Sequence, residues 1–248
     1  MDKNTSVGRR KSDRDLLYIK DTQKVTELAM EAVVLYLSSA EKPTSEEAHK
    51  IIDEVLKDHD CESPHGHIVA GGAQSAKPHE IGEGEIEKGV PIVIDIFPRS
   101  RTTGYFADMS RTVCIGQPSD KLQKMYHDVL SLQLLAISMI KPGVKCSEIH
   151  TAVADHFKKA GYVTSGKGEE FRFAEGFVHS VGHGVGLNIH EAPYLGSESV
   201  DVLCEGDVIT IEPGLYYKEI GGVRLEDLLV VTSEGSENLT NYPKNISI

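Results

Sequence analysis

Two short stretches of the sequence share one layout: Gly89–Asp95 (GVPIVID) and Gly206–Glu212 (GDVITIE). Each begins with a glycine, continues through a mostly apolar and β-branched run, and ends on a carboxylate. Runs of this kind predict buried β-strands, and an unpaired acidic side chain is costly at the end of a buried strand. One such acid alone would favour a salt bridge or a helix cap, but two of them favour a shared function.

A second acidic residue follows each of these strands at a similar distance. Asp108 lies 13 positions after Asp95, Glu226 lies 14 after Glu212, and a glycine precedes each second acid by four positions. Because Asp95 and Glu212 are 117 positions apart, a duplicated unit of that length is the simplest account, although residue identity between the halves is low and coincidence stays open. Packed around a pseudo-twofold axis, the two hairpins would bring four carboxylates together.

The segments around the strands also follow one order in both halves: helix, proline-containing break, helix, Gly/His-rich loop, strand, strand. Thr44 and Glu47 form a capping box at one helix start, and Ser119 caps another. We expect a catalytic domain over residues 19–248, with halves of approximately 19–117 and 118–235, after an arm over residues 1–18. The expected elements are helices over 21–38, from 44, from 119 and from 147 to about 161, and strands over 90–97, 105–115, 207–212 and 222–232.

The composition is that of an ordinary soluble globular protein, with 40% apolar and 26% charged residues among 248. No apolar run approaches the roughly 18 residues of a membrane span, and the polar N-terminus lacks the apolar core of a signal peptide. A formal net charge of −12 without a basic stripe disfavours nucleic-acid binding. The four scattered cysteines indicate reduced, mostly buried thiols of a cytoplasmic protein. They are Cys61, Cys114, Cys146 and Cys204.

A third stretch, His179–Glu191 (HSVGHGVGLNIHE), interleaves three histidines with three glycines. A lone histidine in a glycine-rich loop is more often structural, but four acids elsewhere in the chain change that balance. Four carboxylates and one imidazole suit a pair of divalent cations, which bridging carboxylates hold roughly 3.5–4 Å apart. A water between them would become a nucleophile at neutral pH. Such oxygen-rich ligation favours Mn²⁺, with Co²⁺, Fe²⁺ and Zn²⁺ as alternatives.

These motifs together resemble the metallopeptidase family of methionine aminopeptidase, aminopeptidase P and prolidase. The resemblance covers nearly the whole chain from about residue 15. It implies an α+β pita-bread (creatinase/aminopeptidase) fold, in which two pseudo-twofold-related halves form a curved antiparallel sheet backed by helices. The matching motifs are Ile94-Asp95, Gly104–Thr112 (GYFADMSRT), His179–Pro193, Thr210–Gly214 (TIEPG) and Gly221–Asp227 (GGVRLED).

The resemblance also implies roles for particular residues. Two metals would be bound, with Asp108 and Glu226 as bridging ligands. Glu212 would in addition take and relay the proton of the attacking water. The implied metal ligands are Asp95, Asp108, His183, Glu212 and Glu226; the residues implied to contact substrate and tetrahedral intermediate are His79 and His190; and the supporting residues are His179 and Arg224. Only surface or loop roles are expected for His49, His65, His67 and His127.

Within the family, residues 212–216 (EPGLY) and 221–227 (GGVRLED) look like the aminopeptidase P and prolidase branch. The implied function is a metal-dependent aminopeptidase or dipeptidase that hydrolyses Xaa-Pro bonds, with glycines 182, 184 and 186 letting backbone approach the proline ring. The open alternatives are a methionine aminopeptidase, creatinase-like C–N hydrolysis, and a non-catalytic peptide-binding module. The expected partner is a peptide substrate rather than nucleic acid or a membrane, and a homodimer stays open.

Two departures from the family pattern stand out. Residues 95–99 (DIFPR) lack the glycine usual two positions after the first ligand, and residues 100–103 lengthen the following turn. We expect this to alter a pocket wall rather than the metals. Typical relatives of this branch also carry an additional N-terminal domain. Residues 9–15 resemble the junction after such a domain, so the sequence is expected to be a fragment or a minimal form.

Overall fold

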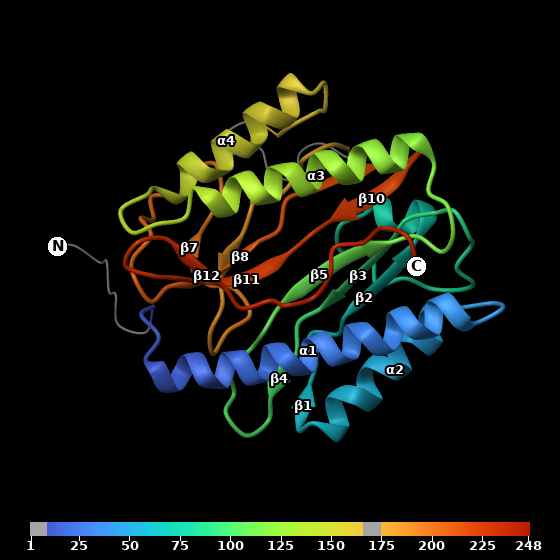
Figure 1. Cartoon of the computed structure of the whole chain (residues 1–248), viewed down its shortest axis with the longest axis horizontal. Helices are drawn as coiled ribbons and strands as arrows, with labels where there is room; N and C mark the ends of the chain where they lie inside the picture. Colours follow the sequence, from blue (N-terminus) through green and yellow to red (C-terminus); the bar gives the residue numbers. More distant parts are fainter. Residues whose placement is uncertain (1–8, 166–174) are drawn as a thin grey trace.

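The computed structural model describes residues 9–165 and 175–248, so residues 1–8 of the expected arm and 166–174 of the second Gly/His-rich tract lie outside it. Helices α1 and α2 lie on one side of the strands in Figure 1, and α3 and α4 lie on the other. Among the described residues, no helix has the length and apolar character needed to cross a membrane. The helices are α1 (Asp13–Ser39), α2 (Ser45–Asp58), α3 (Asp120–Ser138), α4 (Cys146–Lys159) and the 3₁₀ helix η1 (Gly72–Ala76).

Helix α1 begins earlier than expected, so residues 13–18 are not part of an extended arm. Its N-cap is Ser12, whose side chain accepts a hydrogen bond from the Asp15 amide, while the Asp15 carboxylate accepts one from the Ser12 amide at 2.9 Å. This reciprocal capping satisfies two amides that a helix start otherwise leaves unpaired. The N-caps expected at Thr44 and Ser119 are confirmed, but among the described residues the Glu47 side chain makes no reciprocal contact with the Thr44 amide, so the capping box is only half formed. Helix α4 instead begins after Lys145, which makes no side-chain cap.

The strands form small antiparallel sheets. One has the order β2-β3-β5, a second has the order β12-β11-β8-β6-β7, and β1-β4 and β9-β10 form separate pairs. Their bounds are β1 Cys61–Glu62, β2 Ile68–Gly71, β3 Ile92–Ile96, β4 Arg99–Ser100, β5 Met109–Val113, β6 His183–Gly184, β7 Glu191–Tyr194, β8 Val208–Ile211, β9 Gly214–Tyr217, β10 Gly221–Arg224, β11 Asp227–Val231 and β12 Ser236–Asn238.

The expected strand pairs are present, with one correction. Strands β3 and β5 pair as predicted and place Asp95 opposite Ser110. The single strand expected over residues 222–232 is two strands, because β10 pairs with β9 whereas β11 pairs with β8. The break falls at Leu225-Glu226, so Glu226 stands between strands that belong to different sheets.

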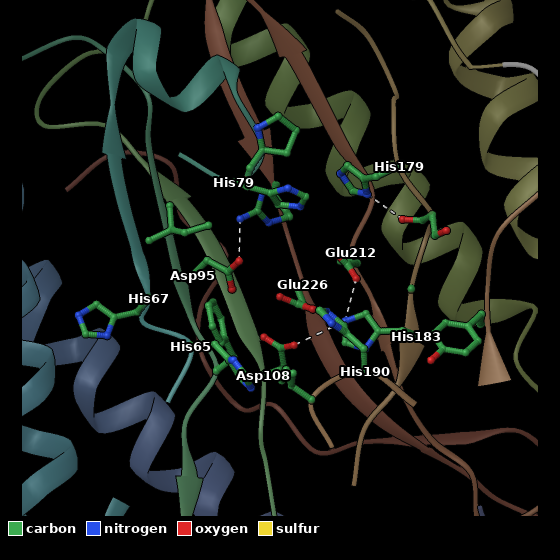
Figure 2. A pocket seen from close by; sticks show the side chains of 18 of the residues that line it. His65, His67, His79, Asp95, Asp108, His179, His183, His190, Glu212 and Glu226 are labelled. Atoms are coloured by element: carbon green, nitrogen blue, oxygen red, sulfur yellow. Dashed lines mark hydrogen bonds and ion pairs between the residues drawn. The ribbon is translucent and has the colours of Figure 1, made fainter. Parts of the chain in front are cut away.

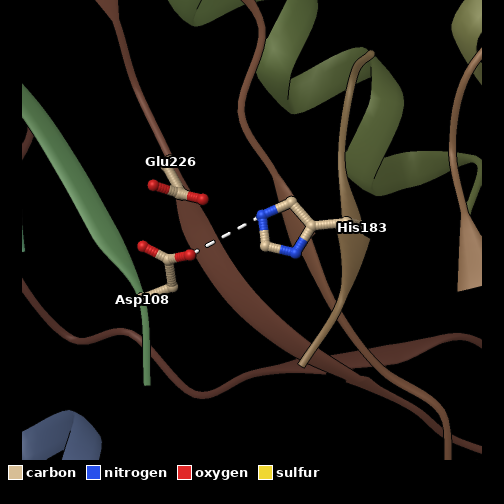
Figure 3. A group of neighbouring side chains, drawn as sticks. All are labelled: Asp108, His183 and Glu226. Carbon is tan, nitrogen blue, oxygen red and sulfur yellow. Dashed lines mark ion pairs between the residues drawn. The ribbon is translucent and has the colours of Figure 1, made fainter. Parts of the chain in front are cut away.

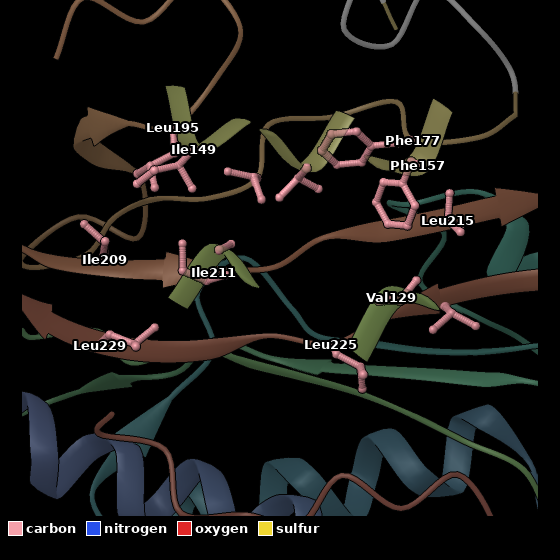
Figure 4. Packing of buried hydrophobic residues seen from close by; sticks show 14 of the residues in the cluster. Val129, Ile149, Phe157, Phe177, Leu195, Ile209, Ile211, Leu215, Leu225 and Leu229 are labelled. Carbon is pink, nitrogen blue, oxygen red and sulfur yellow. The ribbon is translucent and has the colours of Figure 1, made fainter. Parts of the chain in front are cut away.

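Side-chain alternation along the strands directs the acids away from the helices. In β3, Ile94 is buried in a core with α1 and α2, so its neighbour Asp95 faces the opposite side. In β8, Ile209 and Ile211 are buried in a second core beneath α3 and α4, which Figure 4 shows in part. Glu212, at the end of β8, therefore points away from that core. Each helix pair thus covers one face of its strands and leaves the other face for the acids.

Candidate active site

A cavity of about 700 Å³ opens where the acid-bearing strand ends meet. Its walls come from both halves of the sequence, and in Figure 2 Asp95, Asp108, His183, Glu212 and Glu226 point toward one another while the His67 ring is turned away from them. All nine residues singled out in the sequence line this cavity, which brings together motifs far apart in the chain. They are His79, Asp95, Asp108, His179, His183, His190, Glu212, Arg224 and Glu226.

Three side chains form a compact, fully buried group at the floor of the cavity (Figure 3). Asp108, His183 and Glu226 each offer a ligand atom, and these atoms lie within 4.8 Å of one another. The Nε2 atom of His183 lies 3.6 Å from Asp108 Oδ2 and 3.1 Å from Glu212 Oε1. Asp95 completes the set: its Oδ2 atom accepts a hydrogen bond from Arg224, but its buried Oδ1 atom has no hydrogen-bond partner among the described residues.

The negative charges of this group lie close together and shift the pKa values of its members. Burial and the negative charge of Asp95 raise the pKa of Asp108 well above its usual value, and burial and the charge of Asp108 do the same to Glu226. Burial alone would lower the pKa of His183, but the hydrogen bond and charge of Glu212 raise it to about 9. Burial alone would raise the pKa of Glu212, but the hydrogen bond and charge of His183 lower it to about 2.

These observations fit hard divalent cations. The four carboxylates carry more negative charge than His183 and Arg224 offset, and Asp95 Oδ1 retains an unused lone pair that is aimed into a buried site. Carboxylate oxygens with a single imidazole suit hard ions such as Mn²⁺, whereas a thiolate-rich ligand set is typical of zinc sites. All five residues proposed as ligands could therefore hold such ions.

Two hydroxyl groups that the sequence reasoning missed orient these carboxylates. Ser110 Oγ donates to Glu226 Oε2 at 2.9 Å, and it accepts from Arg224 Nε at 2.9 Å. Thr210 Oγ1 donates to Glu212 Oε1 at 3.2 Å, and it accepts from the His183 amide at 3.1 Å. Thr210 lies two positions before Glu212, the acid that it contacts, so strand periodicity was a signal that could have found it, whereas no spacing in the sequence links Ser110 to Glu226.

Arg224 connects Asp95 to a buried tyrosine, which was also missed. Its guanidinium donates to Asp95 Oδ2 at 2.7 Å and to the Tyr216 hydroxyl at 2.8 Å. The Tyr216 hydroxyl lies 2.9 Å from His179 Nε2, and His179 Nδ1 lies 2.7 Å from the Ser180 carbonyl oxygen. Since a carbonyl only accepts, Nδ1 carries the ring proton and Tyr216 donates to Nε2. Burial lowers the pKa of His179 to about 4, so this ring is neutral.

The other two expected histidines lie at the cavity with their rings accessible from it. The His190 ring packs edge-on against His183, with ring centroids 4.3 Å apart. Burial, followed by the charge of His183, lowers the pKa of His190 to about 4, so it is neutral near pH 7. His79 lines the same cavity. Neutral imidazoles can donate a hydrogen bond toward developing negative charge.

His67 lies in the loop before β2, as expected, but the expectation of a surface role is wrong for it. This residue is only 6% exposed, and both it and His65 line the cavity. The His67 ring packs on His49 of α2, with centroids 4.8 Å apart, and burial lowers its pKa to about 4. Because no strong apolar strand pattern surrounds His67, neither β2 nor the burial of this histidine was predicted.

The three glycines of the His-rich stretch let neighbouring segments of the protein itself pack closely. The expected approach of their backbone to a proline ring stays a prediction, and Gly182 is one of the residues that line the cavity. A Cβ atom would lie 2.0 Å from the Thr210 carbonyl oxygen at Gly182, 2.5 Å from the Ala192 carbonyl oxygen at Gly184, and 2.5 Å from a Glu191 carboxylate oxygen at Gly186.

Comparison with known proteins gives concordant results at the level of sequence. A model of metallopeptidase family M24 matches residues 18–233. The Xaa-Pro dipeptidase of Pyrococcus horikoshii is 33% identical over 238 residues, which cover 95% of this chain and 64% of that protein. An uncharacterized peptidase of Bacillus subtilis, YqhT, is 38% identical over 73% of this chain and 48% of its own length. The chain thus spans about half to two thirds of the length of these relatives.

Solved structures agree with the sequence comparison. The prolidase from Pyrococcus horikoshii superposes with a TM-score of 0.86 at 33% identity, covering 97% of this chain and 65% of its own. The prolidase from Pyrococcus furiosus gives the same TM-score at 32% identity, covering 96% of this chain and 67% of its own.

Proposed function

Because the chain belongs to metallopeptidase family M24, we propose that it is a metal-dependent peptidase that hydrolyses Xaa-Pro bonds, as aminopeptidase P and prolidase do. Its pita-bread fold agrees with the expectation from sequence, since prolidase structures superpose over nearly all of it. The observation that carries the proposal is the meeting of four carboxylates and His183 in one cavity. The preference for Xaa-Pro rests on relatives named as Xaa-Pro dipeptidases.

The proposed cofactors are two divalent metal ions, Mn²⁺ first, with Co²⁺, Zn²⁺ and Fe²⁺ as alternatives. Asp108 and Glu226 share the buried group with His183 and would be among the residues that hold the ions. When bound, the ions would supply a hydroxide nucleophile at neutral pH and neutralise the charge that develops on the scissile carbonyl oxygen. The ligands proposed are Asp95, Asp108, His183, Glu212 and Glu226.

The remaining steps fall to groups of the chain itself. Glu212 stands at the cavity as a carboxylate, so it can accept the proton of the attacking water and pass it to the departing nitrogen. The neutral ring of His190 can donate an N–H to the oxygen of the tetrahedral intermediate. His79 lies near Asp95 on the cavity wall (Figure 2) and follows Pro78, whose carbonyl oxygen accepts a hydrogen bond from Arg224 at 3.2 Å; it would hold the substrate backbone.

Proline differs from other residues at the scissile bond because its nitrogen carries no hydrogen and its φ angle is fixed. A site that selects it must fit the ring without requiring a hydrogen bond from that nitrogen. Both ring nitrogens of His179 are engaged within the protein, which leaves the ring itself for packing. Ile81, Phe97 and Ile189 add apolar wall to the same cavity. These features support a proline-directed pocket.

Two finer parts of the proposal concern the whole chain. The pseudo-twofold relation between residues 19–117 and 118–235 stays a prediction, supported by the similar order of helices and strand pairs in the two halves. A cytoplasmic location is supported by four free cysteines, three of them buried.

A peptide panel tests the function directly. Xaa-Pro dipeptides, longer Xaa-Pro peptides, matched Xaa-Ala peptides and Met-Ala peptides are assayed with Mn²⁺, Co²⁺ and Zn²⁺, with the His190→Ala variant as the background control. We expect kcat/KM for Xaa-Pro to exceed that for Xaa-Ala at least tenfold, which corresponds to about 1.4 kcal/mol in transition-state binding. Equal values would remove the proline-directed assignment.

The same panel separates the alternatives. A preference for Met-Ala peptides would instead indicate a methionine aminopeptidase. Peptide binding without hydrolysis under any metal would indicate a non-catalytic peptide-binding module.

A further inference from the structure

The segment before α1 is docked on a distant loop. Arg9 donates to Asp207 Oδ1 at 3.0 Å and to the Val202 carbonyl oxygen at 3.1 Å. The Lys11 amide donates to the Gly206 carbonyl oxygen at 2.9 Å. Residues 9–12 are therefore held along residues 201–207.

From this docked position, Lys11 reaches the segment that carries His190. Its Nζ atom lies 2.6 Å from Glu191 Oε1 and also donates to the Arg9 carbonyl oxygen at 3.0 Å. The side chains are only 4% and 20% exposed, so this is a largely buried ion pair. A carboxylate withdrawn from water in this way depends on its cation, because breaking one side of a buried pair leaves an uncompensated charge.

The Glu191 carboxylate is the centre of the turn formed by residues 186–191. Its Oε2 atom accepts a hydrogen bond from the Asn188 amide at 3.3 Å, and its oxygens fill the space beside the α-carbon of Gly186. The Gly186 carbonyl oxygen in turn accepts from the Phe106 amide at 2.8 Å, which ties the turn to the segment leading to Asp108. The turn thus closes around one charged group.

His190 is the residue directly before Glu191, and its ring packs against the proposed ligand His183 at a centroid distance of 4.3 Å. We propose that Lys11 is a positioning residue: through Glu191 it holds turn 186–191 and thereby keeps His190 aimed into the cavity. This inference rests on the proposed function, in which His190 contacts substrate and intermediate. Without Lys11 the carboxylate moves toward water and the adjacent imidazole moves with it. Displacements on the order of 1 Å can cost up to about 100-fold in rate.

Two measurements on the metal-loaded protein test the proposal. In Lys11→Met, we expect kcat to fall about tenfold or more with KM little changed, and exchange of the Asn188 amide proton to accelerate about tenfold. The matched control is Lys20→Met, because Lys20 forms an exposed ion pair with Glu237 on the surface and should change neither quantity. Lys11→Arg keeps the charge and should retain most of kcat. If Lys11→Met does not fold, Glu191→Gln removes the same ion pair with almost no change in volume.

A double-mutant cycle separates positioning from a general loss of stability. Since Lys11 acts through His190, adding Lys11→Met to His190→Ala should lower kcat no further. Unchanged exchange at Asn188 in both Lys11→Met and Glu191→Gln would overturn the proposal, as would an undiminished effect of Lys11→Met in the His190→Ala background. Hydrogen exchange is measured without substrate, so a chain that cleaves no Xaa-Pro peptide would refute the proposed function while the exchange result still decides whether the ion pair holds the turn.

Discussion

The carboxylates of the cavity depend on small neighbours that set their direction. Ser110 is shared between Glu226 and Arg224, and Thr210 is shared between Glu212 and the His183 amide. Hydroxyl groups suit this position because one hydroxyl can donate to a carboxylate and accept from an N–H group at the same time. Partners of this kind typically alter metal affinity when they are removed, even though they do not touch the metal.

Replacing Ser110 by Ala should therefore weaken metal binding. The change leaves Glu226 Oε2 without its donor and Arg224 Nε without its acceptor, and we expect Mn²⁺ affinity to fall about 10- to 100-fold. Calorimetric titration of metal-free protein measures this. Ser138→Ala is the control, because Ser138 is exposed at the end of α3 and its hydroxyl donates to the Leu135 carbonyl oxygen of the same helix. Equal affinities of the two variants would contradict the role assigned to Ser110.

Replacing His190 by Ala should abolish most turnover while the fold and metal content stay intact. Loss of a donor to developing negative charge costs on the order of 100-fold in kcat. Glu212→Gln should abolish turnover as well, but Glu212 is also a proposed ligand, so metal loss would confuse the result. The measurement is kcat of His190→Ala after its metal content has been determined. Near-normal kcat in a folded, fully loaded variant would refute the assignment.

At the level of elements, the strands with strong apolar runs were predictable and the irregular ones were not. The β-branched runs before Asp95 and Glu212 became β3 and β8, each with its expected partner. The division of residues 222–232 into β10 and β11 was not visible, because an apolar run does not reveal that its two ends pair with different strands. Residues 13–18 were missed as helix for another reason: the capping signal at Ser12 lies within a highly charged segment that has no apolar periodicity.

The contact between His49 of α2 and His67, in the loop before β2, predicts how stability depends on pH. The pKa of His67 is lowered to about 4 by burial, so between about pH 4 and pH 6.5 the unfolded chain binds a proton there that the native protein does not. This histidine's contribution to stability is complete above pH 6.5 and is lost as the pH falls through that range. Going from pH 7 to pH 5, the loss amounts to about 2 kcal/mol.

Urea unfolding of wild type and His67→Phe at pH 7 and pH 5 measures that contribution. The free energy of unfolding should fall by about 2 kcal/mol less in the variant than in wild type. His127→Phe, at an exposed position of α3, is the matched control and should behave as wild type. If all three proteins lose the same stability on acidification, His67 is not kept neutral by its burial.

At the scale of the whole molecule, the sequence predicted which residues meet but not how they are supported. All nine proposed site residues line one cavity. They could be named from the sequence because the motifs that contain them are specific in spacing and in order. Tyr216, Ser110 and Lys11 were missed, since each acts through a hydrogen bond or ion pair that only the folded chain creates. Side-chain burial could be inferred from periodicity, whereas polar partners from distant segments could not.

Removal of metal should destabilise the molecule, and more strongly at neutral than at acidic pH. The pKa values of Asp108 and Glu226 are raised by burial and by repulsion from neighbouring carboxylates, so in metal-free protein their contribution is favourable at low pH and is lost as the pH rises through those raised values. Protons also compete with metal for the same carboxylates. The difference in stability between loaded and metal-free protein therefore widens from pH 5.5 to pH 7.5.

Melting temperatures with and without a chelator give this difference. At a hundredfold excess of metal over its Kd, binding adds about 2.7 kcal/mol, which corresponds to roughly 5–10 °C for a chain of this size. Coincident melting temperatures at pH 7.5 would show that the acidic group does not bind the ions in the native state.

Anomalous diffraction from crystals saturated with Mn²⁺ tests the central claim most directly, because it locates each ion against its ligands. We expect two adjacent peaks in the cavity, bridged by Asp108 and Glu226 and completed by Asp95, His183 and Glu212. Asp95 and Asp108 lie on or beside β3 and β5, whereas the other three come from the second half of the chain. A single peak, or two peaks whose ligands come from one half alone, would contradict a dinuclear centre assembled from both halves.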